Sequence, residues 1–281
     1  MKSSGWFLTL STKVLIAIYS VVILWWLSIF FRGIQETTEN YAFSLIYSVI
    51  PLSWGIIGFL NARRWGGLTS LVGRAVLFLS AGIFAWGIGN LIFAYYNLVL
   101  QIPVPYPSLA DAGFFLIYPL SAIGMSYLFK VTGASFGLRS KSAKLALLII
   151  PLLLILLSYY LLFIVARGGE ISYDGDLLKL FLDIAYPVGD VIVITLAAVV
   201  YLFSFKYLGG LFRIPVILIL IGFISNYIAD FLFSYTTTTE TYFVGKWVDL
   251  FYPTAFLLIS LGLNLFDPRL ASDRSNNNEK P

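Results

Sequence analysis

The stretch LFLDIAYPVGDVIVITLAAVVYLFS, residues 180–204, decides the fold class of this chain. It is a mostly apolar run long enough to cross a bilayer as a helix, since a hydrocarbon core of about 30 Å needs about 20 helical residues. It also contains two aspartates and a proline, and ionisable groups inside a membrane are costly and therefore functional candidates. Residues 180–204 therefore bear on both the fold and the function of the chain.

Seven further apolar runs of similar length lie on either side of residues 180–204. The predicted spans are residues 14–31, 41–60, 75–98, 109–130, 144–166, 180–204, 212–234 and 243–266. Long apolar runs disfavour a β-barrel, whose strands show short segments of alternating polarity. The predicted fold is an all-α, polytopic membrane helical bundle, with residues 1–266 as a single transmembrane domain. The polar tail, residues 267–281, is predicted to be short, cytoplasmic and disordered.

The composition of the 281 residues supports a membrane protein and excludes several kinds of chemistry. Hydrophobic residues make up 59% of the chain and charged residues 11%, against about 25% charged residues in soluble domains. The chain has no cysteine and no histidine. Haem, iron–sulfur clusters, zinc sites built from these residues and Ser-His-Asp relays are therefore excluded. No cofactor and no enzymatic activity are expected, and carboxylate, hydroxyl, amide and aromatic chemistry remains.

The distribution of basic residues predicts the orientation in the membrane. Of the 18 basic residues, only Arg32, Arg167, Lys179 and Lys246 fall in one set of connecting segments, and the rest fall in the opposite set. The positive-inside rule then places both termini in the cytoplasm of a cell-membrane protein. The net charge of +4 is a topology signal, so no nucleic-acid partner is expected and the lipid bilayer is the predicted surrounding. Most acidic residues fall in the predicted outer loops or inside the spans.

Prolines recur at nearly equal spacing, one in each even-numbered span, and three of the four follow a tyrosine. They are predicted to kink their helices and are Pro51, Pro119, Pro187 and Pro253. Equal spacing with the same neighbour predicts four helical hairpins related by an internal repeat, a common way to build membrane bundles. The alternative is that prolines are frequent in membrane helices and that similar hairpins align by chance.

Polar side chains inside the spans form the candidate site. Asp183 and Asp190 lie on one face of the sixth span, and Asp190 lies about 15 Å from its outer end, near the midplane. The candidate ligand- or ion-binding residues are Asp111, Tyr118, Asp183, Tyr186, Asp190, Asn226, Asp230, Asp249 and Tyr252. Their oxygen atoms suit a small cationic or polar ligand. The alternative is that the acids pair with Lys179, Lys246 or tyrosines and only hold helices together.

The segment PSLADAGFFLIYPLSAIG, residues 107–124, resembles the N-terminal multi-span membrane region of some prokaryotic signalling proteins. In those proteins the module precedes a diguanylate cyclase, a phosphodiesterase or a sensor kinase domain. The matching positions are Pro107, Ser108, Ala110, Asp111, Tyr118, Pro119 and Gly124. The resemblance implies a membrane-embedded sensory module. Because no effector domain follows the last span, we expect its output to pass through a separate signalling protein on the cytoplasmic side.

Three further functions compete with a stand-alone sensor that has an outward-facing acidic site. A cation- or proton-coupled secondary transporter could use Asp190 as the coupling group. A structural membrane subunit would need no ligand at all. An intramembrane aspartyl protease needs two facing carboxyls that share a proton, and no second aspartate is expected at the depth of Asp190, because Asp230 lies near the outer end of its predicted span.

Overall fold

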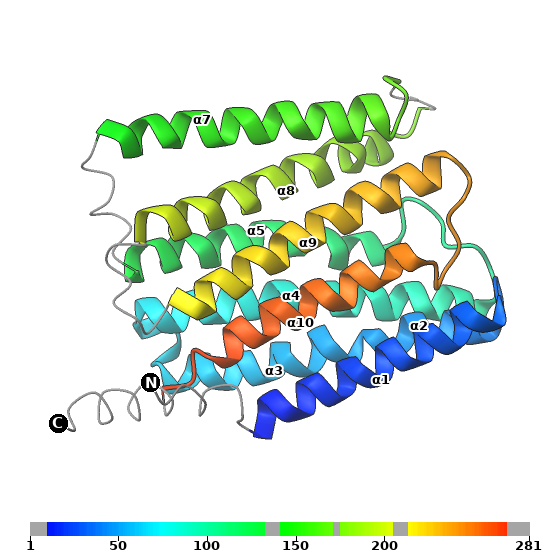
Figure 1. The fold of residues 1–281 in the computed structure, drawn as a ribbon, viewed down its shortest axis with the longest axis horizontal. Helices are drawn as coiled ribbons and strands as arrows, with labels where there is room; N and C mark the ends of the chain where they lie inside the picture. The colour runs from blue at the N-terminus through cyan, green and yellow to red at the C-terminus, as the bar shows by residue number, and fades with distance from the viewer. Residues whose placement is uncertain (1–9, 133–140, 171–174, 205–212, 269–281) are drawn as a thin grey trace.

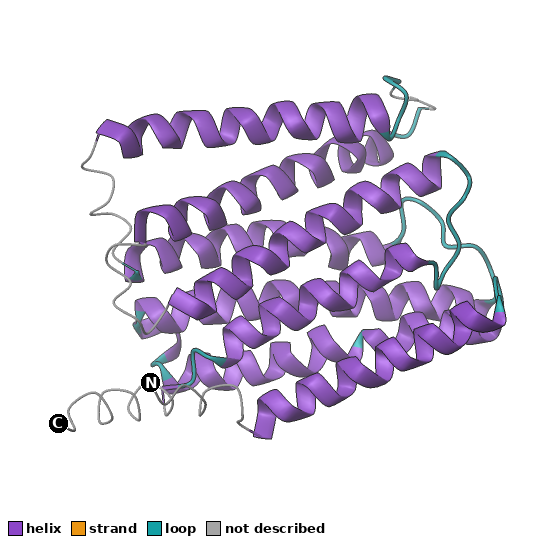
Figure 2. Ribbon diagram, viewed as in Figure 1, coloured by secondary structure: helices purple, strands orange, loops and turns teal. Residues whose placement is uncertain are grey.

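The structure is a computed structural model that describes residues 10–132, 141–170, 175–204 and 213–268 (Figure 1). These residues form helices and connecting loops, with no strand among them (Figure 2). The α-helices are α1 (Leu10–Arg32), α2 (Thr38–Tyr47), α3 (Val49–Arg64), α4 (Leu71–Tyr95), α5 (Leu109–Val131), α7 (Lys141–Ser158), α8 (Leu177–Ser204), α9 (Arg213–Thr238) and α10 (Phe251–Asn264). Eight helical stretches of the described chain are long and apolar enough to cross a membrane, which confirms the all-α bundle. The tail predicted to be disordered lies, from residue 269 on, outside the described residues.

Several spans are not single uninterrupted α-helices. The second span contains α2 and α3, which meet at Ser48. The third and fifth spans each end in a π-helix, at Tyr96–Leu100 and Tyr159–Val165. The eighth span starts with a 3-10 helix, Trp247–Leu250, ahead of α10. It begins later than the predicted residue 243 because Gly245, with φ of 86°, turns the chain there.

The four recurring prolines take two different positions in these helices. Pro119 and Pro187 lie in the interior of α5 and α8. Pro51 and Pro253 lie in the first turn of α3 and α10. Proline is well tolerated in a first turn, where its missing N–H would have no intrahelical acceptor anyway. These two prolines therefore mark where the second and eighth spans are interrupted.

Small residues bring neighbouring helices close together in the centre of the bundle. One example joins α4 and α5, where a Cβ added to Gly113 would lie 2.6 Å from the Cα of Gly89. Such close backbone approach is the usual basis of helix packing in membranes, where no hydrophobic force draws helices together. The helices α1 and α7 lie at opposite edges (Figure 1), and they bury the smallest share of their spans, 22% and 11%.

The first and last helices meet at one end of the bundle. The hydroxyl of Ser11 donates to Oδ1 of Asn264 at 3.0 Å, and Nδ2 of Asn264 donates to the hydroxyl of Thr12 at 2.8 Å. The loops 33–37, 101–108 and 239–246 lie at the opposite end (Figure 1). Following the predicted orientation, we call this loop-bearing end the outer end.

Candidate functional site

Two aspartates from adjacent helices are neighbours inside the bundle, and we call them the carboxyl pair. They are Asp190 of α8 and Asp230 of α9, and their side chains are close enough to interact. Asp190 is buried and Asp230 is partly buried. Among the described residues, neither carboxyl forms an ion pair with a lysine or arginine. The pair therefore places two acidic groups together within the spans without a basic partner.

Asp230 ties the pair to two further helices. Its Oδ2 accepts hydrogen bonds from the hydroxyl of Tyr118 on α5, at 3.2 Å, and from Nδ2 of Asn226 on α9, at 2.8 Å. Its Oδ1 accepts a hydrogen bond from the hydroxyl of Tyr252 on α10, at 2.9 Å. With Asp190 from α8, side chains of four helices meet at this point. A change of charge or position at the pair would therefore act on all four helices.

Two buried oxygen atoms at the pair have no hydrogen-bond donor. They are Oδ2 of Asp190 and Oδ1 of Asn226, and the two side chains lie within interaction distance of each other. A buried acceptor without a donor costs about 1–3 kcal/mol. Both atoms would gain a partner if the site held a proton or a cation. The arrangement is therefore suited to a positively charged ligand.

The expectation that no second aspartate lies at the depth of Asp190 is wrong. The predicted seventh span ended at residue 234, which put Asp230 close to its outer end, but α9 continues to Thr238. The threonines of the last turns need no water, because a threonine hydroxyl can bond back to the carbonyl of the preceding turn, as Thr236 does to Leu232 at 2.8 Å. Asp230 consequently lies deeper in the bundle and reaches Asp190.

A second acidic group, Asp111, lies at the start of α5 on the outer side of the pair. Its Oδ2 accepts hydrogen bonds from the backbone N–H and the hydroxyl of Ser108, at 2.7 and 3.1 Å. Together with the bond from the N–H of Ala110 to the Ser108 hydroxyl, this forms the capping box of α5, which satisfies N–H groups that lack intrahelical partners. Oδ1 of Asp111 accepts a hydrogen bond from the hydroxyl of Tyr186 on α8, at 2.8 Å. Asp111 therefore both caps α5 and links it to α8.

Asp183 lies at the outer end of α8 and carries the ion pair of this region. Its Oδ1 is 2.8 Å from Nη2 of Arg167 and accepts a hydrogen bond from the hydroxyl of Tyr106 at 3.0 Å. Burial, followed by the charge of Asp183, raises the pKa of Tyr106 above its usual range, so this hydroxyl keeps its proton. Asp183 is therefore paired with Arg167, which the alternative did not name, and with a tyrosine, as the alternative expected.

Asp249 is buried and belongs to a separate arrangement before α10. Its carboxylate accepts hydrogen bonds from the Tyr242 hydroxyl, at 3.0 and 3.3 Å, and from the Gly245 N–H at 2.7 Å. Burial, followed by the charge of Asp249, raises the pKa of Tyr242 well above its usual range. Lys246 donates instead to the carbonyl oxygen of Thr241. The bonds of Asp249 hold the loop before α10, so this residue is not joined to the carboxyl pair.

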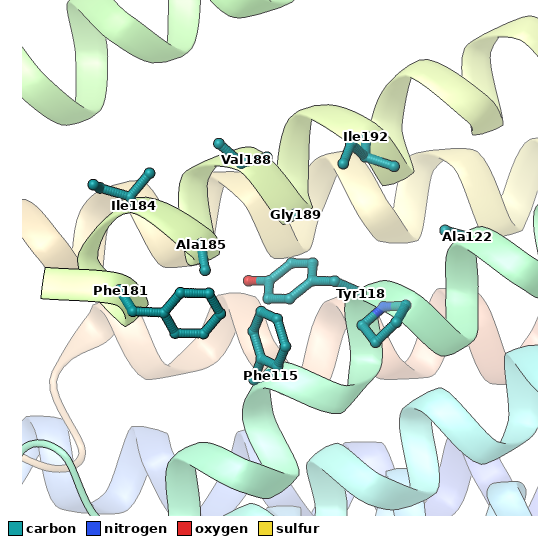
Figure 3. A pocket seen from close by; sticks show the side chains of 10 residues that line it. Phe115, Tyr118, Ala122, Phe181, Ile184, Ala185, Val188, Gly189 and Ile192 are labelled. Atoms are coloured by element: carbon teal, nitrogen blue, oxygen red, sulfur yellow. The ribbon is translucent and has the colours of Figure 1, made fainter. Parts of the chain in front are cut away.

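An apolar groove of about 410 Å³ lies between α5 and α8, next to the pair (Figure 3). Phe115 and Phe181 line it together with the ring of Tyr118, whose hydroxyl bonds Asp230. Gly189 lies directly over this ring, and a Cβ added there would be 2.7 and 2.8 Å from Cδ1 and Cδ2 of Tyr118. Tyr118 is therefore shared by the groove and the carboxyl pair.

The structure adds four residues that the candidate set did not contain. Arg167 and Tyr106 hold Asp183, Tyr242 holds Asp249, and Gly189 makes room for Tyr118. Arg167 could have been noticed as one of only four basic residues in the predicted outer segments. The other three have no distinguishing signal in the sequence, because their roles depend on which helices are neighbours.

Comparisons of the chain with protein-family models, with curated proteins and with solved structures found no match. The resemblance of residues 107–124 to signalling proteins therefore stays a prediction. The structure gives physical roles to some of the residues that carry the resemblance. Ser108 and Asp111 form the capping box of α5, and Tyr118 bonds the carboxyl pair. The site geometry is the basis for the function proposed below.

Proposed function

We propose that this multi-pass membrane protein is a sensor or ligand-binding module whose ligand site is the carboxyl pair. The observation that carries the proposal is the pair itself: Asp190 and Asp230 lie together within the spans, without a basic partner among the described residues. Two neighbouring acidic groups inside the bundle cannot both carry a charge at low cost, so a proton or a small cation completes the site. The free oxygens of Asp190 and Asn226 supply acceptors for it.

The response of such a sensor follows from the helices that meet at the pair. Asp230 is bonded by Tyr118 and Tyr252, from α5 and α10. When the ligand leaves, the two carboxylates repel each other, and the arrangement of α8 against α9 that brings them together becomes less favourable. A ligand that binds one arrangement better than another shifts the population between them, which is the energetic requirement for a switch. We expect a separate signalling protein on the cytoplasmic side of the cell membrane to respond to the changed arrangement of the helices.

Ligand binding is tested by the thermal stability of the purified chain in detergent. The panel contains alkali-metal ions, small amines and a pH series, and the variants are Asp190→Asn and Asp249→Asn. We expect at least one ligand or pH change to shift the unfolding temperature of the wild type, and the Asp190→Asn variant to lose that shift. Asp249→Asn is the matched control, since it neutralises a buried carboxylate that is not joined to the pair. A wild type that responds to nothing, or an Asp190→Asn variant that responds like the wild type, would refute the proposal.

A cation- or proton-coupled transporter is the second candidate, favoured by the position of an uncompensated carboxyl pair among several helices. It is tested by counterflow into liposomes with a broad panel of substrates. Flux that Asp190→Asn abolishes would establish transport. Absence of flux with intact ligand binding would favour the sensor.

The same preparation tests an aspartyl protease, for which neighbouring carboxyls are also required. Peptide cleavage by the wild type that is lost in both Asp190→Asn and Asp230→Asn would show that the protein is an enzyme and not a sensor.

A further inference from the structure

Hydrogen bonds between tyrosines and aspartates form a series along the facing sides of α5 and α8. The hydroxyl of Tyr106 donates to Asp183 at 3.0 Å, and the hydroxyl of Tyr186 donates to Asp111 at 2.8 Å. Deeper in the bundle, the hydroxyl of Tyr118 donates to Asp230. Each of these bonds joins groups from different segments of the chain. The series runs from the outer end of the bundle to the carboxyl pair.

Solvent exposure in this region is highest at Tyr106 and lowest at Asp190, and Tyr186 and Asp230 are partly buried. Tyr106 is 44% exposed and the side chain of Asp183 is 11% exposed. Asp111 is 8% exposed and Asp190 is 3% exposed. The polar groups therefore lead from the surface of the outer end to the buried pair. Polar groups that reach from the surface to the pair can serve as an access route.

The two middle members of the series are adjacent. The rings of Tyr186 and Tyr118 pack edge to face with centroids 6.0 Å apart. Tyr186 also lies within electrostatic range of Asp230. Toward the other end of the bundle, the buried hydroxyl of Ser121 on α5 and that of Thr195 on α8 have no hydrogen-bond partner. At these two residues, the series of bonds has no continuation toward the cytoplasmic end.

An ion pair stands at the outer start of the series. Nη2 of Arg167 is 2.8 Å from Oδ1 of Asp183, so the two opposite charges compensate each other. Among the described residues, no group of three acidic side chains is placed to hold a metal ion. A proton needs no such group, because a hydroxyl or a protonated carboxyl can both donate and accept a hydrogen bond. The combination favours a proton over a metal ion as the species that reaches the pair.

We propose that the ligand of the carboxyl pair is a proton, and that it arrives from the outer end through Asp111, Tyr186 and Tyr118. This inference rests on the proposed function and names its ligand. The Tyr186 hydroxyl first turns from Asp111, to which it donates, toward Tyr118, whose ring it contacts. A proton taken up by Asp111 then passes to the phenol oxygen of Tyr186, which releases its own proton to Tyr118. Tyr118 in turn gives its hydroxyl proton to Asp230 and is restored by the incoming one. One proton moves inward, both phenols end unchanged, and no electron is transferred.

The groups that face the pair fit this assignment. The titratable ones are Tyr118 from α5, Tyr186 from α8, Tyr227 from α9 and Tyr252 from α10. The described residues supply no lysine or arginine ion pair to either carboxyl of the pair. Protonation of one carboxyl is therefore the change that removes charge from this part of the bundle.

The test follows the carboxyl vibration of the full-length chain by time-resolved infrared spectroscopy after a pH jump. The protein is reconstituted in liposomes sorted for one orientation, and the band of the protonated pair is identified by its loss in Asp190→Asn. We expect the band to respond to a jump on the outer side. Tyr186→Phe should slow this response by at least about tenfold, as expected when a positioned proton-transfer group is lost, while the equilibrium midpoint stays unchanged. Asp111→Asn, which retains an acceptor for the capping box, should slow it likewise.

The matched control is Tyr160→Phe, which removes an exposed phenol from the π-helix after α7 and should match the wild-type rate. Wild-type rates in both Tyr186→Phe and Asp111→Asn, or an equally fast response to a jump on the inner side, would overturn the route. In that case the proposed function stands if the band still titrates. A wild-type band that does not respond to pH at all would overturn both the route and the proton as ligand, while a thermal shift with a cation or amine would still support the binding module.

Discussion

Replacing Gly189 with alanine is the sharpest test of the contact between α8 and Tyr118, whose hydroxyl bonds the carboxyl pair. The added Cβ would lie 2.7 and 2.8 Å from Cδ1 and Cδ2 of Tyr118, where carbon atoms normally stay about 3.5–4.0 Å apart. The ring would have to retreat by about 1 Å, but Tyr186 and Phe115 pack against it with centroids 6.0 and 6.2 Å away. Its hydrogen bond to Asp230, already 3.2 Å long, would be lost.

The magnitude follows from three contributions to the free energy of unfolding. Overpacking costs about 1–3 kcal/mol, and the lost hydrogen bond costs about 1 kcal/mol. The higher helix propensity of alanine offsets this by about 1 kcal/mol. We therefore expect Gly189→Ala to destabilise the protein by about 1–3 kcal/mol. Unfolding by a denaturing detergent in mixed micelles measures this quantity.

A double-mutant cycle with Tyr118→Ala isolates the contact. Without the ring, the alanine at position 189 has room, so Gly189→Ala should cost little in the Tyr118→Ala background. Tyr118→Phe keeps the ring and should not rescue it. A cost of Gly189→Ala that is the same in all three backgrounds would show that the reasoning about this contact is wrong.

Three further predictions concern the outer end. Ser108→Ala removes the capping box of α5 and should lower the free energy of unfolding by about 0.5–2 kcal/mol, while Ser108→Asp, which restores a capping oxygen, should not. Tyr242→Phe leaves the buried Asp249 with the Gly245 N–H as its remaining hydrogen-bond donor in the described loop and should cost about 1–3 kcal/mol without changing the pH response of the carboxyl pair. A changed response would show that Asp249 belongs to the site. Because burial raises the pKa of Tyr106 above its unfolded value of about 10, the folded state favours the protonated phenol, and this stability is complete below pH 10 and is lost as the pH rises further. Tyr106→Phe should therefore lose less stability in alkaline buffer than the wild type, and an identical loss would contradict the assignment.

The fold class was predictable from the sequence because the membrane restricts the chain to few structures. Spans must satisfy their own backbone hydrogen bonds, so long apolar runs such as residues 180–204 become helices. The ends of spans were harder to predict because hydropathy does not decide where a helix stops. The helix α9 continues to Thr238 through polar residues such as Thr236, whose hydroxyl bonds the backbone, whereas the turn at Gly245 interrupts a stretch that the apolar pattern includes.

The members of the candidate site were predictable, but not their grouping. Asp190 and Asp230 stand out individually, since ionisable residues are rare inside spans. That they form a pair depends on the packing of α8 against α9, which no spacing within one helix reveals. The same reason separates Asp249 from them, because its partners come from the neighbouring loop. Gly189 acquires its role only through the ring of Tyr118 on another helix.

The most direct test of the central claim is an infrared titration that determines whether Asp190 and Asp230 share one proton. The wild type, the two single asparagine variants and the double variant are titrated in nanodiscs. If the two carboxyls act as one unit, the wild type shows one protonated-carboxyl band, and either single substitution removes that titration as completely as both together. Two independent bands, each removed by one substitution alone, or no protonated carboxyl near neutral pH, would contradict the account.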